Sequence, residues 1–223
     1  MLKFLQKKSQ PVAKKPAVAQ TPQQVVAKPP NPISPKAPTL ITLDQLRNGL
    51  GITRERADYW DDWLNEAMNL YNINTKKRIA SFLAQVGHES GRLKYTSEIW
   101  GPTATQKRYE GRKDLGNIYP GDGSRFRGHG LIQTTGRHNH RRVTQRLRAR
   151  FPNMNVPDFE AEPNKLTLPR WAALSAADYW DMINGNSLAD KDQFTLLTRK
   201  INGGLTGLSD RKKLWTSMLK VLR

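Results

Sequence analysis

The sequence predicts a mostly α-helical domain of two lobes with a cleft between them, preceded by a disordered tail. Apolar residues recur at helical spacing in several segments after residue 39. Residues 90–130 break that pattern with glycine, charged and aromatic residues, which indicates long loops. Residues 1–38 contain eight prolines, seven lysines and no acidic residue, a composition typical of a disordered chain. We therefore expect a tail over residues 1–38 and one folded domain over residues 39–223.

Helix signals are clearest near the start of this domain. Thr42 and Gln45 have the spacing of a capping box. Residues 53–71 carry an aromatic and aliphatic stripe at helical spacing, which is typical of a buried face. Residues 75–88 predict the next helix, with Glu89 on its last turn. The other expected helices are one that begins near Arg137 and continues to residue 147, and those over residues 168–182, 193–201 and 210–222.

Composition excludes several classes of protein. The chain has 223 residues, which suits one domain with an appendage. It has no cysteine, so neither disulfides nor thiolate-bound metals hold it together. No run of 18 apolar residues occurs, and the N-terminal residues lack the apolar centre of a secretory signal. We expect neither a transmembrane helix nor a signal peptide.

The chain is strongly basic. Its net charge is +18, of which the tail lysines carry +7 and residues 39–223 the remaining +11. Such a charge attracts polyanions, and bacterial walls, lipopolysaccharide and nucleic acid are all candidates. A surface that merely improves solubility is the alternative.

Two glutamates form the main candidate site. Glu89 ends a predicted helix, and Glu98 follows nine residues later in a loop. A pair of carboxyl groups can cleave a glycosidic bond when one acts as the acid and the other activates water. Glu110, between Arg108 and Arg112, is the rival for the second role, although we expect it to pair with a guanidinium as part of the scaffold.

Five blocks of sequence around these residues stand in a recognisable order. They are HES at Glu89, EIWGPT at Trp100, RYEGRKDLGN at Tyr109, PGDGSRFRGHGLIQ at Arg125 and INGG at Asn202. In these blocks the chain resembles glycoside hydrolase family 19, over roughly residues 39–223. That family contains chitinases and the lysozyme-like endolysins of bacteriophages, and the endolysin branch is the closer match. The resemblance implies a lysozyme-like or chitinase-like helical fold.

The resemblance also implies roles for individual residues. Glu89 would be the general acid and Glu98 the base. Gln133 would hydrogen-bond a sugar, Thr135 would hold the attacking water, and Asn139 would contact the substrate. The alternative is that these three residues only shape a turn and a helix start.

The resemblance implies two more site residues in the family's closing segment, Asn202 in INGG and Arg211 in SDR. Asn202 would bind substrate across the cleft, and Arg211 would hold a catalytic carboxylate through a bidentate pair. The alternative is that Gly203 and Gly204 merely end a helix and that Arg211 lies on the surface.

Aromatic and histidine residues complete the candidates. Trp100 and Tyr109 are expected either to stack on sugar rings or to pack in the core. His138 and His140 form an HxH pair, but HESGR lacks the second histidine of a zinc-protease helix. We predict neither a metal nor any other cofactor.

The leading hypothesis is an inverting hydrolase of β-1,4 bonds in bacterial peptidoglycan, used for host cell lysis or wall penetration. Expected partners are peptidoglycan and an anionic wall or outer-membrane surface, with no nucleic acid and a monomeric chain. We expect it in the host cytoplasm before release to the wall, or carried in the virion. Two alternatives stay open, a chitinase and an inactive basic protein that binds walls or nucleic acid. Arg125 and Arg127 are better explained as residues that shape the cleft than as a phosphate site.

Overall fold

The structure is a computed structural model that describes residues 38–222. The predicted tail lies outside the described residues, except for Pro38. Within residues 38–222, no helix has the length and apolar character needed to cross a membrane.

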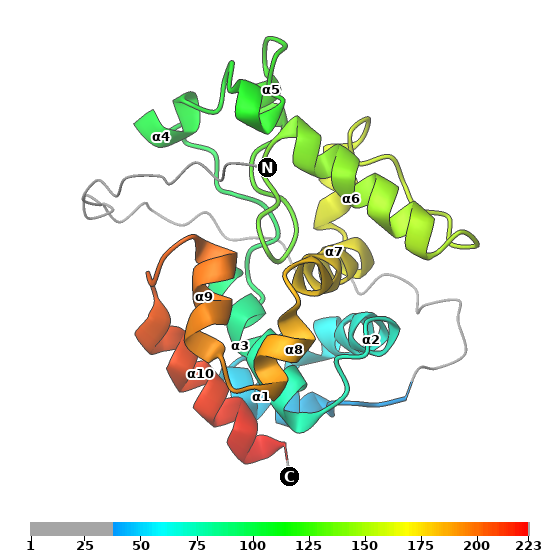
Figure 1. Cartoon of the computed structure of the whole chain (residues 1–223), viewed down its shortest axis with the longest axis vertical. Helices are drawn as coiled ribbons and strands as arrows, with labels where there is room; N and C mark the ends of the chain where they lie inside the picture. Colours follow the sequence, from blue (N-terminus) through cyan, green and yellow to red (C-terminus); the bar gives the residue numbers. More distant parts are fainter. Residues whose placement is uncertain (1–37, 223) are drawn as a thin grey trace. The chain divides into compact units, whose positions relative to one another are not determined.

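The described part of the chain is mostly helical, as predicted (Figure 1). Its α-helices are α1 (Leu43–Leu50), α2 (Arg54–Leu70), α3 (Lys76–Glu89), α4 (Ala104–Lys107), α5 (Asp122–Arg125), α6 (Arg137–Arg150), α7 (Pro169–Met182), α8 (Gly185–Asp190), α9 (Phe194–Asn202) and α10 (Leu208–Val221), and its 3₁₀ turns are η1 (Lys113–Leu115) and η2 (Pro163–Thr167).

Capping threonines fix where the first helices begin. The hydroxyl of Thr42 accepts a hydrogen bond from the backbone amide of Gln45, and the Gln45 side chain completes the predicted capping box. Thr53 and Thr75 cap α2 and α3 in the same way. The predicted starts of these three helices are therefore confirmed.

Most of the helices pack into one lobe around α3. This helix contacts α1, α8, α9 and α10, while α2 packs between α1 and α7. The aromatic stripe of α2 lies in this core, with Trp60, Trp63 and Met68 buried. Burial of such side chains contributes about 1.5–3 kcal/mol each.

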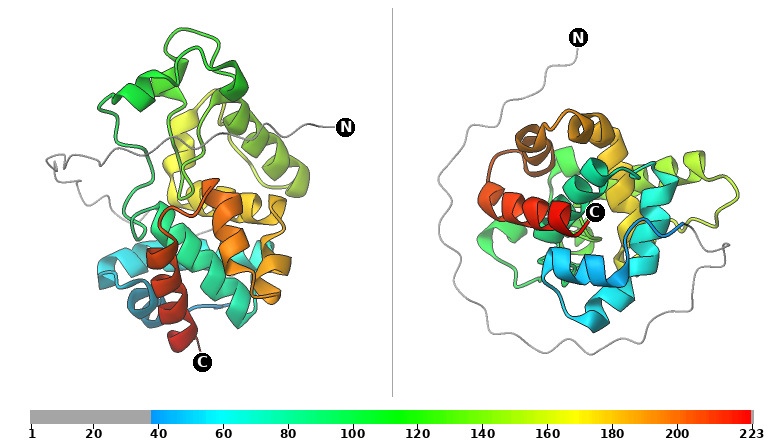
Figure 2. Two further views of the ribbon diagram at one scale, coloured as in Figure 1. Left: turned by 60° about the vertical axis from the view of Figure 1, so that its left-hand side comes forward. Right: turned by 90° about the horizontal axis from the view of Figure 1, so that it is seen from below.

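The second lobe contains α4, η1, α5, α6 and most of the loop chain that connects them, drawn at the top of Figure 1. Helix α6 contacts both η1 and α7, so it joins the two lobes. The left view of Figure 2 shows the same separation of the lobes.

Short elements were not predicted. Helix α8 has six residues, and its first residue, Gly185, lies directly against the Trp180 indole, where a Cβ atom would stand 2.2 Å from the ring. Such a helix is held by tertiary contact and leaves little periodicity in the sequence. The predicted loops of residues 90–130 likewise contain the one-turn helices α4 and α5.

Candidate active site

Glu89 lies at the last position of α3, where the apolar face of the helix ends. Its side chain is 21% exposed, and its carboxylate accepts a hydrogen bond from the guanidinium of Arg211, which is only 1% exposed. A second nitrogen of Arg211 donates to Oε1 of Gln85 at 2.6 Å. Gln85 in turn donates to the Thr198 hydroxyl at 2.9 Å. This buried chain of hydrogen bonds fixes the position of the carboxylate.

Arg211 departs from two expectations. The alternative that placed it on the surface is wrong, because α10 packs along α3 and buries it. It does bind a carboxylate, but one guanidinium nitrogen donates to Glu89 and the other to Gln85, so the two residues make no bidentate pair.

The start of α10 is tied to the end of α3, which positions Arg211. Asp210 accepts hydrogen bonds from His88 at 2.7 Å and from Arg92 at 2.8 Å. Gly207 precedes the helix with a φ of 75° and lies against the His88 ring. A side chain at Gly207 would meet both the strained backbone region and that ring.

Glu98 has a very different environment. One oxygen accepts hydrogen bonds from Gln106 Nε2 at 3.0 Å and the Tyr109 hydroxyl at 3.4 Å. The other accepts the backbone amide of Gly128 at 3.1 Å. Burial raises the pKa of Tyr109, and the Glu98 charge raises it further, so the phenol stays a donor at neutral pH. Three neutral donors suit an ionised carboxylate, which can only accept.

Gly128 connects Glu98 to Gln133. Its carbonyl oxygen accepts the Glu98 amide at 2.7 Å, while a Cβ at Gly128 would stand 2.6 Å from Oε1 of Gln133. Isolated bridges pair His129 with Ser97 and with Thr134. These bridges place the backbones of the Glu98 and Gln133 segments beside one another, which no helical pattern in the sequence could predict.

Glu110 is held by backbone. Its two oxygens accept the amides of Gly121 at 2.6 Å and Gly123 at 2.7 Å, at the start of α5. The predicted pairing with a neighbouring guanidinium is therefore wrong. Arg112 binds Asp114 instead, and Arg108 donates to a threonine hydroxyl. Both oxygens of Glu110 are occupied in fixing a loop, in keeping with the scaffold role.

A cavity of about 260 Å³ lies between α6 and α7. Gln133, Thr135 and Asn139 all line it, so the structure brings these three predicted residues together. Gln133 has a φ of 56°, a conformation that is uncommon for residues other than glycine and is enriched at functional sites. Thr135 donates to the Gln133 carbonyl at 3.0 Å, and Asn139 donates to the Thr135 carbonyl at 2.6 Å.

Tyr179 is a cavity residue whose pKa is affected by the charge of Glu89. Its ring lines the cavity, and its hydroxyl donates to the Lys200 carbonyl at 3.1 Å. Burial raises the pKa of Tyr179, the nearby charge of Arg142 lowers it, and the charge of Glu89 raises it again. The charges of Arg142 and Glu89 therefore both affect the pKa of this phenol.

The remaining predicted residues lie around these groups. Asn202 is exposed at the end of α9, next to Ile201, which lines the cavity. Gly203 does end this helix, with a φ of 74°. Trp100 and Tyr109 are half-buried and contact one another with ring centroids 6.3 Å apart. They lie beside Glu98 and outside the core.

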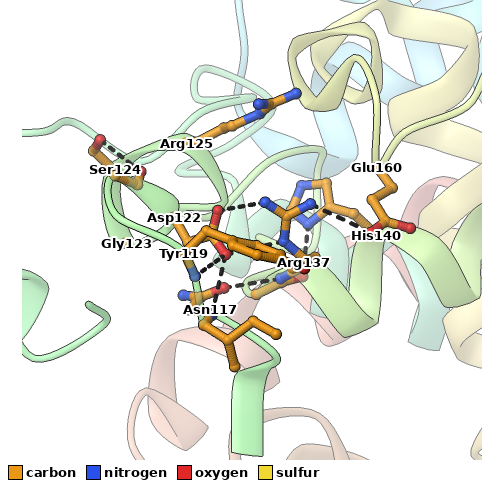
Figure 3. Close-up of polar contacts among 12 residues, drawn as sticks. Asn117, Tyr119, Asp122, Gly123, Ser124, Arg125, Arg137, His140 and Glu160 are labelled. Atoms are coloured by element: carbon orange, nitrogen blue, oxygen red, sulfur yellow. Dashed lines mark hydrogen bonds and ion pairs between the residues drawn. The ribbon is translucent and has the colours of Figure 1, made fainter. Parts of the chain in front are cut away.

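An ion-pair network braces the loop of residues 117–126 against α6 (Figure 3). Arg137 donates to both oxygens of Asp122, at 2.9 and 2.5 Å, and also reaches Glu160. Asp122 is 2% exposed, and the Arg137 hydrogen bonds hold its pKa below the ordinary range. Figure 3 shows Asn117 beside this pair, where it accepts the Arg137 amide at 3.0 Å.

Two histidines lie buried behind the Glu98 segment. Nδ1 of His140 lies 2.9 Å from the Gly136 carbonyl, which can only accept, so this nitrogen carries the proton. Nε2 of His140 then accepts from Nδ1 of His129 at 3.0 Å. Both imidazoles are neutral: burial, the neighbouring His140 and Arg127 lower the pKa of His129 to about 3, and burial lowers that of His140 to about 4.

The histidine pair predicts a loss of stability in mild acid. The unfolded chain binds protons at these two sites below pH 6.5 or so, while the folded chain does not until near pH 4. The free energy of unfolding should therefore fall as the pH drops from 6.5 to 5, with a slope for each histidine that grows from about 0.7 towards about 1.4 kcal/mol per pH unit. Urea unfolding at pH 7, 6 and 5 measures this slope.

His138 provides the matched control for this prediction. It is exposed, so His138→Gln should leave the slope unchanged. A free energy of unfolding that stays constant from pH 7 to 5 in both proteins would contradict neutral burial of the pair.

Several residues of this site were not predicted. Gln85 lies one turn before Glu89 on α3, a spacing that could have revealed it. Gln106 occupies the third position of a capping box with Thr103, which is also visible in the sequence. Gly128 and Tyr179 are brought to the site by tertiary packing, and no local pattern marks them.

Comparisons with known proteins agree with this architecture. No model of a protein family matches the chain. A glycosyl hydrolase family 19 domain-containing protein of Haemophilus influenzae is 31% identical over 171 residues, which cover 65% of this chain and 80% of that protein. Chitinase C from Streptomyces griseus has the same fold, with a TM-score of 0.61 and 20% identity over 82% of this chain and 93% of its own. A bacterial family 19 chitinase gives a TM-score of 0.63 at 20% identity, over 82% of this chain and 95% of its own.

The relative from Haemophilus is similar enough, over enough of its length, to establish kinship, and the solved chitinases share the fold. The chain belongs to glycoside hydrolase family 19 and is a glycoside hydrolase.

Proposed function

We propose that this glycoside hydrolase cleaves the β-1,4 bonds of bacterial peptidoglycan with inversion at the anomeric carbon. The observation that carries the proposal is the contrast between two carboxylates. Glu89 is held by one buried cation, and Glu98 by three neutral donors. The two carboxyl groups therefore differ in their partners, and the resemblance to family 19 assigns the acid to Glu89 and the base to Glu98.

In the proposed reaction, Glu89 gives its proton to the glycosidic oxygen as the bond from that oxygen to the anomeric carbon breaks. The bonding electrons leave with the oxygen. A water molecule attacks the opposite face of the sugar, and Glu98 takes one of its protons. Inversion needs the carboxyl groups roughly 6.5–9.5 Å apart to leave room for this water. Gln133 and Asn139 would hold sugar hydroxyl and amide groups in the adjacent cavity.

Charge and composition favour peptidoglycan over chitin. Residues 39–223 carry +11, which suits an anionic wall better than a neutral polymer. The residues of the five sequence blocks favour the phage endolysin branch of the family, and with it a role in host lysis. In this proposal the enzyme acts as a monomer on the wall, after release from the host cytoplasm or delivery by the virion.

A chitinase is the second candidate, because both solved relatives are named as chitinases. Chitin and peptidoglycan share N-acetylglucosamine, so one cavity could accept either polymer. An inactive binding protein is less well supported, because the chain retains both glutamates together with Gln133 and Asn139.

The test is a turbidity assay on permeabilised Gram-negative cells, run in parallel with release of sugar from chitin. Clearing of the cells with little release from chitin is expected. Hydrolysis of chitin without any clearing would replace peptidoglycan by chitin as the substrate. Failure on both would leave the binding protein as the better hypothesis.

A further inference from the structure

The cavity between α6 and α7 contains two arginines, and they differ in their partners. Arg146 donates to Asp178 at 2.7 Å and also lies 3.6 Å from Asp181. Its charge is therefore balanced by carboxylates. Arg142, one turn earlier on α6, donates at 2.8 Å to Oδ1 of Asn139, which is a neutral amide. Among residues 38–222, no carboxylate pairs with Arg142.

Arg142 is also open to a ligand. Its side chain is exposed at the rim of the cavity, and its one amide partner leaves further guanidinium donors available. Other arginines of α6 are committed to structure, since Arg137 and Arg141 bind Glu160, and Arg148 donates to the Val156 carbonyl.

Arg142 lines the same cavity as the residues that are expected to contact the substrate. Its partner Asn139 lines the cavity beside Thr135 and Gln133, and Tyr179 lines the same cavity. A sugar chain lying across Glu89 into this cavity would bring its substituents to the guanidinium.

We propose that Arg142 is a specificity residue that binds a carboxylate of the substrate, and so favours peptidoglycan over chitin. This inference rests on the proposed function. Peptidoglycan carries carboxylates on the lactyl group of muramic acid or on its peptide stem, whereas chitin has none. A guanidinium binds a carboxylate by charge-assisted hydrogen bonds, which are stronger than those between neutral groups.

The test removes the charge of Arg142 from the enzyme or, separately, the charge of the carboxylates from the substrate. Arg142→Gln should raise KM for peptidoglycan about tenfold with little change in kcat, because the contact is made equally in the ground and transition states. Converting the carboxylates of the substrate to methylamides should raise KM of the unchanged enzyme by the same factor. The variant should respond much less to that conversion, since the specific interaction is already lost and only the general attraction of the basic domain remains.

Arg148→Gln is the matched control, because it removes the same charge from the same helix outside the cavity. Its KM should be within about twofold of the unchanged enzyme. Thermal midpoints of both variants verify that the fold is kept. A comparison of two substrates identifies which carboxylate is bound. Peptide-free oligomers retain only the lactyl carboxylates, whereas oligomers with intact stems carry both kinds.

The outcomes separate this inference from the proposed function. Equal KM values for Arg142→Gln and the unchanged enzyme on peptidoglycan would overturn the role of Arg142 and leave the substrate assignment intact. An equal rise in KM on neutral chitin oligosaccharides would also overturn it, because charge recognition would then not be the cause. If the unchanged enzyme turns over chitin but no peptidoglycan, both the proposed function and this role are wrong.

Discussion

Glu89→Gln should lower kcat by about 10²–10⁴-fold, the usual contribution of a general acid. An amide of the same size keeps an acceptor for Arg211 but has no acidic proton to give. Hydrolysis of purified peptidoglycan under saturating substrate measures the effect. A variant that retains more than about a tenth of the rate would remove Glu89 from the role of acid.

The same change should also cost some stability. The Arg211 guanidinium is buried, and an amide oxygen is a weaker hydrogen-bond partner for it than a carboxyl group. A fall of a few degrees in the thermal midpoint is expected, since about 1 kcal/mol corresponds to roughly 2–4 °C in a chain of this size.

Glu66 separates the two effects. It is a buried glutamate that binds Arg170 through both oxygens, at 2.7 and 3.1 Å, and it joins α2 to α7. Glu66→Gln therefore removes the charge of a buried glutamate that pairs with a partly exposed guanidinium of the scaffold. It should lower the thermal midpoint and leave kcat within a few-fold of the unchanged enzyme. If Glu66→Gln lowered kcat as strongly as Glu89→Gln, general destabilisation would explain both.

Local signals were enough to predict most helices. Thr53 and the stripe that ends near Tyr71 define α2 to within a residue, because capping and helical periodicity are properties of neighbouring residues. The start of α6 at Arg137 was also predicted. The short helix α8 was missed, since it depends on the contact of Gly185 with Trp180.

The candidate site was predictable in its residue types and less so in its contacts. The resemblance to family 19 indicated Glu89, Gln133 and Asn139, and the structure places the latter two in one cavity. Nothing local reveals that Arg211 is buried, because that depends on how α10 packs against α3. The contacts of Glu110 were also not predictable from its neighbours. The adjacent arginines suggested an ion pair, but the carboxylate binds backbone amides of a later loop instead.

The choice between Glu98 and Glu110 as base rests on what each carboxylate contacts. Glu98 is held between the Gln106 amide, the Tyr109 hydroxyl and the Gly128 backbone. Through Gly128 it adjoins Gln133 at the cavity. Glu110 instead accepts the backbone amides of Gly121 and Gly123 at the start of α5, so its contacts are with the scaffold of that loop.

Glu98→Gln should therefore lower kcat by about 10²–10⁴-fold, because an amide cannot take the proton of the attacking water. Glu110→Gln should instead turn an amide nitrogen towards a backbone N–H and leave one donor without a partner. That costs about 1–3 kcal/mol, or several degrees in the thermal midpoint, with kcat within a few-fold of the unchanged enzyme. Measuring kcat and the midpoint on both variants decides between them. Loss of activity in Glu110→Gln at an unchanged midpoint, with Glu98→Gln still active, would move the base to Glu110.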